Sequence, residues 1–145
     1  MNFVSKTFKE LTTEELYEIL RVRAEVFVVE QNCVYQDLDE KDQESLHLFY
    51  EVSGRIQAYL RIFMKNPDEK LVQIGRVLTT ARGTGLGGRI LQDGLREAKR
   101  HYKAQEVYIE AQCYATGYYE KAGFTVTSDE FLEDGIPHVE MKVEI

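Results

Sequence analysis

The sequence predicts an α/β protein of the α+β type, in which a mixed, mostly antiparallel sheet is flanked by helices. Three observations support this class. Apolar stretches of strand length at Leu46–Val52, Arg55–Phe63 and Leu71–Thr79 are separated by short turns, so we expect antiparallel neighbours. Two longer segments have apolar residues at helical spacing. A glycine-rich turn, residues 82–89, joins the last of these strands to the second helical segment.

The chain is predicted to begin with a strand and a long helix. Residues Phe3 to Phe8 alternate between apolar and polar side chains, as a strand does. Thr12 and Glu15 form a capping-box pattern, in which each side chain bonds to the backbone N–H of the other residue. A first helix should then run to about Val29, with apolar residues at helical spacing: Leu16, Ile19, Leu20, Val26 and Phe27.

Turn residues separate the elements that follow. Ser53-Gly54 predicts a hairpin turn, and Asn66-Pro67-Asp68 predicts a turn into the strand at 71–79. The second long helix is predicted from Leu86 to Tyr102, because its apolar residues again recur at helical spacing.

The C-terminal part is predicted to complete the sheet. Glu106–Ala111 has strand character, and Tyr114–Ala122 is predicted as a short helix that Gly123 ends. Phe124–Thr127 and His138–Ile145 are the last predicted strands.

Length and composition fit one domain, residues 1–145, with 43% hydrophobic residues to build a core. No stretch approaches the ~20 apolar residues of a membrane span. Met1–Glu10 lacks the apolar run of a signal peptide, so we expect a cytoplasmic protein. The cysteines, Cys33 and Cys113, lie far apart without C-x-x-C spacing, and we expect two free thiols.

The charge balance excludes some functions. A net charge of −7 disfavours nonspecific nucleic acid binding, because phosphate contacts need a positive surface. The acidic cluster at Asp37, Asp39, Asp42 and Glu44 lacks the central glycine and the ligand spacing of a calcium-binding EF-hand. We therefore interpret it as a solvated acidic loop and predict no metal site.

The glycine-rich turn predicts a phosphate-binding site. Its sequence is Arg82-Gly83-Thr84-Gly85-Leu86-Gly87-Gly88-Arg89. Glycine has no Cβ, so the backbone N–H groups can approach an anion and φ can be positive. The helix that follows directs its partially positive N-terminus to the same point.

Two kinds of phosphate loop fit this turn poorly. The P-loop of nucleotide hydrolases needs Gly-Lys-Ser/Thr, whereas Gly88 is followed by Arg89. The Rossmann fingerprint matches Gly83, Gly85 and Gly88, and Glu110 lies near the end of the next strand, where a ribose-binding acid belongs. Antiparallel strands precede the turn, however, and too little chain follows it for a doubly wound sheet. A Rossmann-type NAD(P) oxidoreductase is therefore our third hypothesis.

The remaining pattern is Arg-x-x-Gly-x-Gly, present as Arg82, Gly85 and Gly87. It resembles the loop that cradles the pyrophosphate of coenzyme A in GNAT acetyltransferases. Nearly the full chain looks like the ElaA-type branch of that family. The resemblance is carried by Glu30-Gln31-Asn32-Cys33-Val34-Tyr35, Gly75-Arg76-Val77, Ala111-Gln112, Tyr119-Glu120-Lys121-Ala122-Gly123-Phe124 and Glu133-Asp134-Gly135-Ile136-Pro137-His138.

This resemblance implies the GNAT acyl-CoA N-acyltransferase fold and an N-acetyltransferase that uses acetyl-CoA and no metal. The strands at 71–79 and 106–111 would splay apart. The backbone of Val77, Leu78 and Thr79 would then bind the pantetheine arm and polarise the thioester carbonyl. Only Thr80 and Ala81 separate this strand from Arg82, a shorter connection than the family usually has.

The resemblance also implies direct attack on the thioester by an amine, either a small molecule or a protein amine. Tyr119 matches the general acid of the family, and Tyr118 should point elsewhere. The base is open between His138, whose ordinary pKa is near 6.5, Glu110 and a water relay. The candidates for acceptor binding are Glu30, Arg76, Glu133 and Asp134. A noncatalytic acyl-CoA-binding sensor is the alternative function, and a homodimer is compatible with either.

Overall fold

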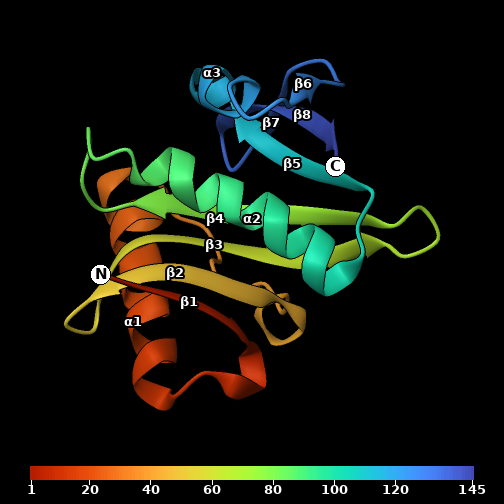
Figure 1. The fold of residues 1–145 in the computed structure, drawn as a ribbon. Coiled ribbons are helices and arrows are strands. Elements are labelled where there is room, and N and C mark those ends of the chain that lie inside the picture. Colours follow the sequence, from red (N-terminus) through yellow and green to blue (C-terminus); the bar gives the residue numbers. More distant parts are fainter.

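The computed structural model describes residues 1–145 and contains one mixed sheet of eight strands (Figure 1). The strand order is β1-β2-β3-β4-β5-β8-β6, and β7 pairs with β8. The strands are β1 (Asn2–Thr7), β2 (Leu46–Val52), β3 (Arg55–Asn66), β4 (Leu71–Thr79), β5 (Glu106–Gln112), β6 (Thr125–Val126), β7 (Phe131–Glu133) and β8 (Ile136–Glu144). The helical elements are η1 (Phe8–Glu10), α1 (Thr13–Arg23), η2 (Ala24–Glu30), η3 (Asp42–Glu44), α2 (Leu86–Tyr102), η4 (Cys113–Ala115) and α3 (Thr116–Glu120).

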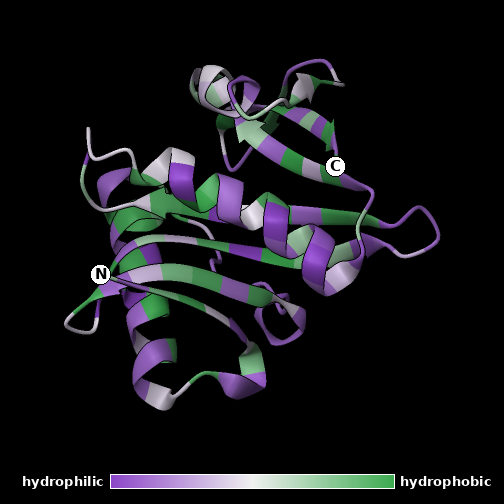
Figure 2. Cartoon of the chain, in the orientation of Figure 1, coloured by the Kyte–Doolittle hydropathy of each residue, from purple (hydrophilic) through white to green (hydrophobic).

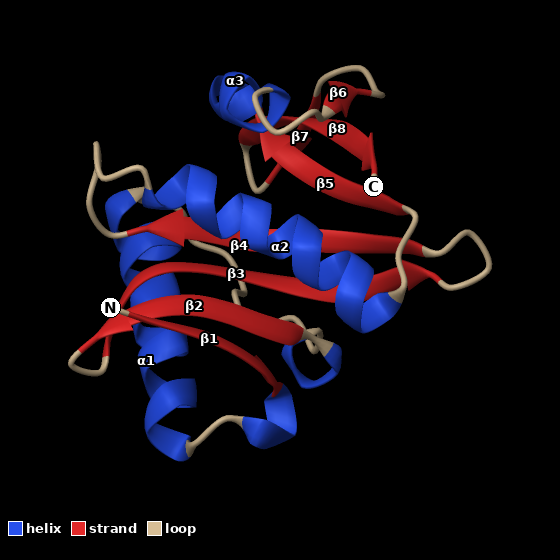
Figure 3. Ribbon diagram, in the orientation of Figure 1, coloured by secondary structure: helices blue, strands red, loops and turns tan.

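The predicted mixed sheet is confirmed. β4 and β5 are parallel, and every other strand pair is antiparallel. Helices α1 and α2 cover opposite faces of the central strands (Figure 3). No helix combines the length and the apolar character that crossing a membrane requires.

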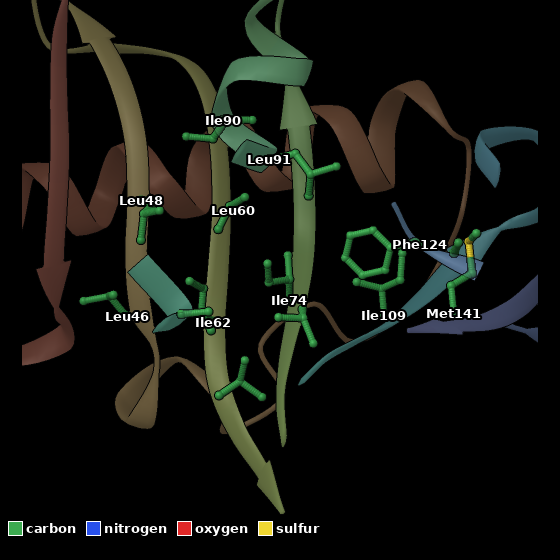
Figure 4. Close-up of a cluster of buried hydrophobic side chains, with 14 of the residues drawn as sticks. Leu46, Leu48, Leu60, Ile62, Ile74, Ile90, Leu91, Ile109, Phe124 and Met141 are labelled. Carbon is green, nitrogen blue, oxygen red and sulfur yellow. The ribbon is translucent and has the colours of Figure 1, made fainter. Parts of the chain in front are cut away.

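Two hydrophobic clusters hold these layers together. The larger one lies between α2 and the sheet, where Ile90 and Leu91 pack near Leu60 and Ile74 (Figure 4). The smaller cluster lies under α1 and joins six buried residues: Ile19, Val22, Phe49, Ile56, Tyr59 and Leu78. Hydrophilic and hydrophobic residues alternate along the strands and along α2 (Figure 2), so that each layer presents an apolar face to its neighbour.

Local sequence rules account for several boundaries. The bounds of β2, β4 and α2 are those predicted. The capping box is present, because Glu15 N–H donates to Thr12 Oγ1 at 3.0 Å and Thr12 N–H donates to Glu15 Oε1 at 2.8 Å. Ser53 and Gly54 have φ of 50° and 77°, the left-handed values that a two-residue hairpin turn of this kind needs.

Other boundaries differ from the prediction. The first helix changes at Ala24 into the π-helix η2, whose wider turns still keep Val26 and Phe27 against the α1 cluster. The predicted short helix is divided into η4 and α3. The strand β7 was not predicted, since three residues are too few to show a period. It pairs with β8 across Asp134-Gly135, so β8 begins at Ile136 rather than His138.

The predicted splay between β4 and β5 is confirmed, and it positions the site. The two strands pair only where Leu71–Gln73 of β4 meets Glu106–Tyr108 of β5. Beyond Gln73 they diverge toward the glycine-rich turn at the start of α2 (Figure 1). β4 also contains a bulge, because Arg61 and Tyr59 of β3 oppose Gly75 and Leu78.

The acidic segment after η2 is only partly the solvated loop that we predicted, because Asp39 and Glu44 are exposed whereas two of its carboxylates are buried. Asp37 and Asp42 are each only 7% exposed. Arg23, which is fully buried, binds Asp37 at 3.0 Å and Asp42 at 2.6 Å. Arg61 binds Asp42 at 2.8 Å. The carboxylates are buried because arginines from α1 and β3 neutralise them, and those partners lie far away in sequence.

Candidate active site

A cavity of about 1120 Å³ occupies the gap between β4 and β5. It runs from the glycine-rich turn, past α3, to the hairpin of β7 and β8. All the residues of Val77–Gly88 except Leu86 line it, as do Tyr118 and Tyr119. The far half is lined by the acceptor-binding candidates and by the two candidate bases: Glu30, Arg76, Glu133 and Asp134, and Glu110 and His138. The structure therefore places nearly all the predicted site residues around one cavity.

The glycine-rich turn has the predicted backbone conformation at two positions. Gly83 and Gly85 have φ of 72° and 77°, values that other residues rarely adopt. Gly85 is the N-cap of α2, so the free N–H groups of the first helical turn lie at the rim of the cavity. Thr84 Oγ1 accepts one of them, from Leu86, at 3.3 Å. The side chain of Leu86 itself is buried in the core, 8% exposed.

The two arginines of the turn point to different places. Arg82 lines the main cavity and forms no ion pair with the protein. The guanidinium of Arg89 lies over the Tyr50 ring, 5.2 Å from its centroid. Arg89 lines a separate hollow of about 520 Å³ between α2 and α3. Of the two, Arg82 is the one in reach of a phosphate in the main cavity.

The bulge of β4 directs its backbone into the gap. Arg76 has a φ of 52°, in the left-handed region that is unfavourable for a residue with a Cβ. Val77 and Thr79 are half-buried, whereas Leu78 packs into the smaller hydrophobic cluster, the one under α1. Beyond Gln73 the β5 side of the strand has no partner in the sheet, so its N–H and C=O groups are free to bind a ligand.

Arg76 itself is held by aspartates. Its Nε donates to Asp37 Oδ1 at 2.8 Å, and its Nη2 donates to the Asp37 carbonyl at 2.9 Å. Nη2 also lies 3.3 Å from Asp39 Oδ2. The candidate acceptor residue Arg76 is thus committed to an ion pair that stabilises the bulge, although its side chain still lines the cavity.

The two neighbouring tyrosines of α3 both reach the cavity, so the expectation that Tyr118 points elsewhere is wrong. Tyr118 Oη donates to the Gly87 carbonyl at 2.6 Å. The Tyr119 ring packs edge-on against Tyr118 and Phe124, with centroids 4.8 Å and 5.9 Å apart. Its hydroxyl lacks a hydrogen-bond partner within the protein. Burial raises the pKa of Tyr119, which therefore keeps its proton at neutral pH.

Three candidate residues meet at the far end of the cavity. The β5–β8 register sets Gln112 opposite His138, and the β7–β8 hairpin brings Glu133 beside it. Glu133 Oε2 lies 3.5 Å from His138 Nε2. Burial, together with the nearby carboxyl group of Glu110, raises the pKa of Glu133 to about 7. A carboxyl group with that pKa can accept a proton near neutral pH.

Two contacts close the gap at its far side. Gln112 Nε2 donates to Gln31 Oε1 at 3.3 Å, and Cys33 Sγ donates to the Asp134 carbonyl at 3.6 Å. Gln31 and Gln112 line the cavity but were not predicted as site residues. Both belong to segments that carry the family resemblance, but the resemblance assigned no role to their uncharged side chains. Both cysteines are free, as expected.

Comparison with known proteins identifies the family. The profile of the acetyltransferase (GNAT) domain family matches residues 8–145. The chain belongs to the GNAT acetyltransferase family. This excludes the Rossmann-type oxidoreductase, and the single parallel strand pair of the sheet agrees with that exclusion.

Relatives of similar length support the assignment to GNAT. A UPF0039 protein of Schizosaccharomyces pombe is 38% identical over 100% of this chain and 98% of its own. The crystal structure of Escherichia coli ElaA has a TM-score of 0.90 at 33% identity, covering 97% of each chain. An acyl-CoA N-acyltransferase from Pseudomonas aeruginosa has a TM-score of 0.91 at 38% identity, covering 98% of this chain and 99% of that one. The predicted ElaA-type GNAT fold is thereby confirmed.

Proposed function

We propose that this protein is an N-acetyltransferase that transfers the acetyl group of acetyl-CoA to an amine. One observation supports the proposal: a single cavity is lined by the glycine-rich N-terminus of α2, by Tyr119 and by the carboxyl and imidazole groups of Glu110, Glu133 and His138. Binding of coenzyme A at one end and of an amine at the other would bring the reacting groups together.

The residues present fit coenzyme A. The N–H groups of the turn at Gly83–Gly88 would hold the pyrophosphate, and Arg82 would add a positive charge. The unpaired backbone of Val77–Thr79 would bind the pantetheine arm, and it would stabilise negative charge on the thioester oxygen. When bound, acetyl-CoA supplies an activated acetyl group.

Two proton transfers then fall to this chain. A neutral amine forms a bond to the acetyl carbon while the carbon–sulfur bond breaks. The proton lost by the nitrogen goes to the Glu133 carboxylate, whose pKa of about 7 suits a base. Glu110 and His138 act on Glu133, the former by its charge and the latter as a neighbouring proton acceptor. Tyr119 protonates the departing thiolate and regains its proton from solvent.

A covalent enzyme intermediate is not part of this proposal. Burial and Glu130 raise the pKa of the Cys113 thiol, which makes a thiolate nucleophile scarce at neutral pH. The Cys33 thiol donates a hydrogen bond to the Asp134 carbonyl oxygen.

The test is acetyl transfer with purified protein. Acetyl-CoA is incubated with a panel of amines, and both the released thiol and the acetylated amine are quantified. We expect both products in equal amounts, and their loss in Tyr119→Phe. A protein that binds acetyl-CoA in calorimetry but acetylates no amine of the panel would instead be the noncatalytic acyl-CoA sensor.

A further inference from the structure

One strained residue lies inside the strand that borders the gap. Arg76 of β4 has a φ of 52°, whereas the other non-glycine residues with positive φ lie in turns, in loops or at the end of α2. A residue with a Cβ disfavours this conformation, because the Cβ comes too close to the following carbonyl oxygen. The conformation persists only where surrounding contacts hold it in place.

A glycine at residue 76 would remove this backbone cost. The preceding residue, Gly75, is a glycine, but its φ is not positive, and a Cβ there would meet no atom within 4 Å. The bulge therefore has its glycine one residue before the position that favours one. The conformation at residue 76 thus depends on what the arginine side chain binds.

Asp37 is the main partner of that side chain. Besides the two hydrogen bonds that Arg76 donates to Asp37, the guanidinium lies over the Tyr35 ring, 5.4 Å from its centroid. Tyr35 Oη donates to the same Asp37 oxygen at 2.5 Å. Only 21% of the Arg76 side chain and 8% of the Asp37 side chain are exposed, so solvent and salt screen the pair weakly.

Asp37 is held in turn by a fully buried residue of α1. Arg23 Nε donates to Asp37 Oδ2 at 3.0 Å, and Arg23 Nη2 donates to the Asp37 carbonyl at 3.2 Å. Each carboxylate oxygen of Asp37 therefore binds a different arginine. Asp37 joins the bulge of β4 to the helix on the α1 face of the sheet.

The bulge determines where the next backbone groups of β4 point. Arg76 and Val77 together oppose Leu60 of β3. The backbone that follows, Val77–Thr79, is the part that would bind the pantetheine arm and the thioester. A change of φ at residue 76 would rotate this backbone relative to the gap.

We infer that Asp37 and Arg76 are positioning residues, which hold the bulge in the conformation that presents Val77–Thr79 to an acyl-CoA. This inference rests on the proposed function. Arg76 acts through its backbone conformation, and its guanidinium binds Asp37 rather than the acceptor. This role replaces the acceptor binding that the sequence predicts for Arg76.

Arg76→Gly and Arg76→Ala test the inference as a pair. Both remove the guanidinium, and they differ only in the Cβ, which disfavours the left-handed φ. We expect the Kd for acetyl-CoA, measured by calorimetry, to be about fivefold higher in Arg76→Ala than in Arg76→Gly. Adenosine 3′-phosphate 5′-diphosphate has no pantetheine arm and should bind both variants equally. Equal Kd values for acetyl-CoA would overturn the inference.

Lys70 provides the matched control. Its φ is 51°, and it lies in the exposed turn before β4, outside the cavity lining. Lys70→Gly and Lys70→Ala should bind acetyl-CoA equally. A difference as large as the one at residue 76 would show that the backbone cost acts on the whole fold, which would also overturn the inference.

Asp37→Asn tests the other half of the bridge. Asp42→Asn is its control, because Asp42 is also 7% exposed and binds Arg23, but it does not contact Arg76. With both variants folded, acetyl-CoA should bind more weakly to Asp37→Asn, and adding Arg76→Gly should restore affinity, since glycine needs no partner. Absence of this rescue would contradict the role of Asp37. If Asp37→Asn does not fold, the comparison at residue 76 decides alone.

Amide hydrogen exchange tests the inference without a ligand. The segment 77–80 contains the Thr80 N–H, which donates to the Gln57 carbonyl at 3.0 Å. It should exchange faster in Arg76→Ala than in Arg76→Gly, and equal rates would contradict the inference.

Acetyl transfer separates this inference from the proposed function. Differences between the two Arg76 variants in exchange and binding, in a protein that acetylates no amine, would contradict the acetyltransferase and leave the positioning role standing. Acetyl transfer at equal rates in both variants, with equal exchange, would do the reverse.

Discussion

Tyr118 Oη donates a hydrogen bond of 2.6 Å to the carbonyl oxygen of Gly87, and this bond joins α3 to the first turn of α2. The two residues are also in steric contact, because a Cβ on Gly87 would lie 3.3 Å from the Tyr118 ring. A side chain at residue 87 would therefore crowd the Tyr118 ring. The glycine-rich turn is thus tied to α3, the helix that carries Tyr119.

Tyr118→Phe tests this dependence. The ring and its packing remain, but the bond to Gly87 is lost, so the start of α2 is held less firmly. We expect the Kd for coenzyme A to rise about two- to tenfold, the effect of one hydrogen bond. Calorimetry measures it, and Tyr17→Phe on the exposed side of α1 is the matched control. An unchanged Kd would mean that packing alone positions the turn.

Gly87→Ala tests the steric contact between residue 87 and the Tyr118 ring. The added methyl group must displace the Tyr118 ring by a few tenths of an ångström, so coenzyme A should bind more weakly than to the unaltered protein. In Tyr118→Ala the obstructing ring is gone, and adding Gly87→Ala there should cost little further affinity. Two losses that simply add would argue that the residues act independently.

Tyr119→Phe separates catalysis from binding. The phenylalanine keeps the packing against Phe124 but has no proton to give to the thiolate. General acid steps contribute about 10²–10⁴ in rate, so kcat should fall within that range while the Kd for acetyl-CoA changes little. A near-normal kcat, with chemistry shown to be rate-limiting, would remove Tyr119 from the mechanism. A larger loss of kcat in Tyr118→Phe would transfer the role to Tyr118.

The pH dependence of kcat/KM tests Glu133. Its raised pKa means that the carboxyl group is protonated below about pH 7 and becomes an active base above it, so the rate should rise with pH through that region. Glu133→Gln should abolish this rise of kcat/KM with pH, which is the acidic limb of the profile. Glu110→Gln removes the neighbouring negative charge, lowers the pKa of Glu133 and shifts the limb to lower pH. If kcat/KM rises at the same pH in both variants as in the unaltered protein, the titrating group is not Glu133.

Sequence patterns predicted the parts of this molecule that depend on neighbours along the chain. The capping box at Thr12, the hairpin turn at Ser53-Gly54 and the glycine-rich turn before α2 each follow from local backbone requirements. The splay of β4 and β5, in contrast, came from the family resemblance, because no local pattern marks where two strands stop pairing.

The errors concern partners that only the tertiary fold brings together. The pairing of Asp37 with Arg23 and Arg76 joins three separate elements, so spacing within the acidic segment could not show it. The direction of Tyr118 depends on how α3 packs on α2. Glu110, Glu133 and His138 were each named as candidates, but their convergence follows from the register of β5, β7 and β8.

The buried ion pairs give a prediction about stability. Asp42 binds both Arg23 and Arg61, and its backbone carbonyl lies 2.9 Å from His47 Nε2. Asp42→Asn leaves buried guanidinium charge undercompensated, so the free energy of unfolding should fall by about 3–5 kcal/mol. Glu25→Gln removes an exposed partner of Arg21 and should cost less than about 1 kcal/mol. Similar losses in the two variants, measured by urea denaturation, would contradict the importance of burial.

The same carboxylate predicts sensitivity to acid. Burial alone would raise the pKa of Asp42, but the hydrogen bonds and charges of Arg23 and Arg61 lower it below its ordinary value of 3.8. A group whose pKa is lower in the folded state stabilises the protein above its unfolded pKa, and this stabilisation is lost as the pH falls through the folded pKa. Unfolding free energy should therefore decrease below about pH 4. In Asp42→Asn that decrease should be smaller, since the carboxyl group responsible is absent; an equal decrease would assign the acid sensitivity to other carboxylates.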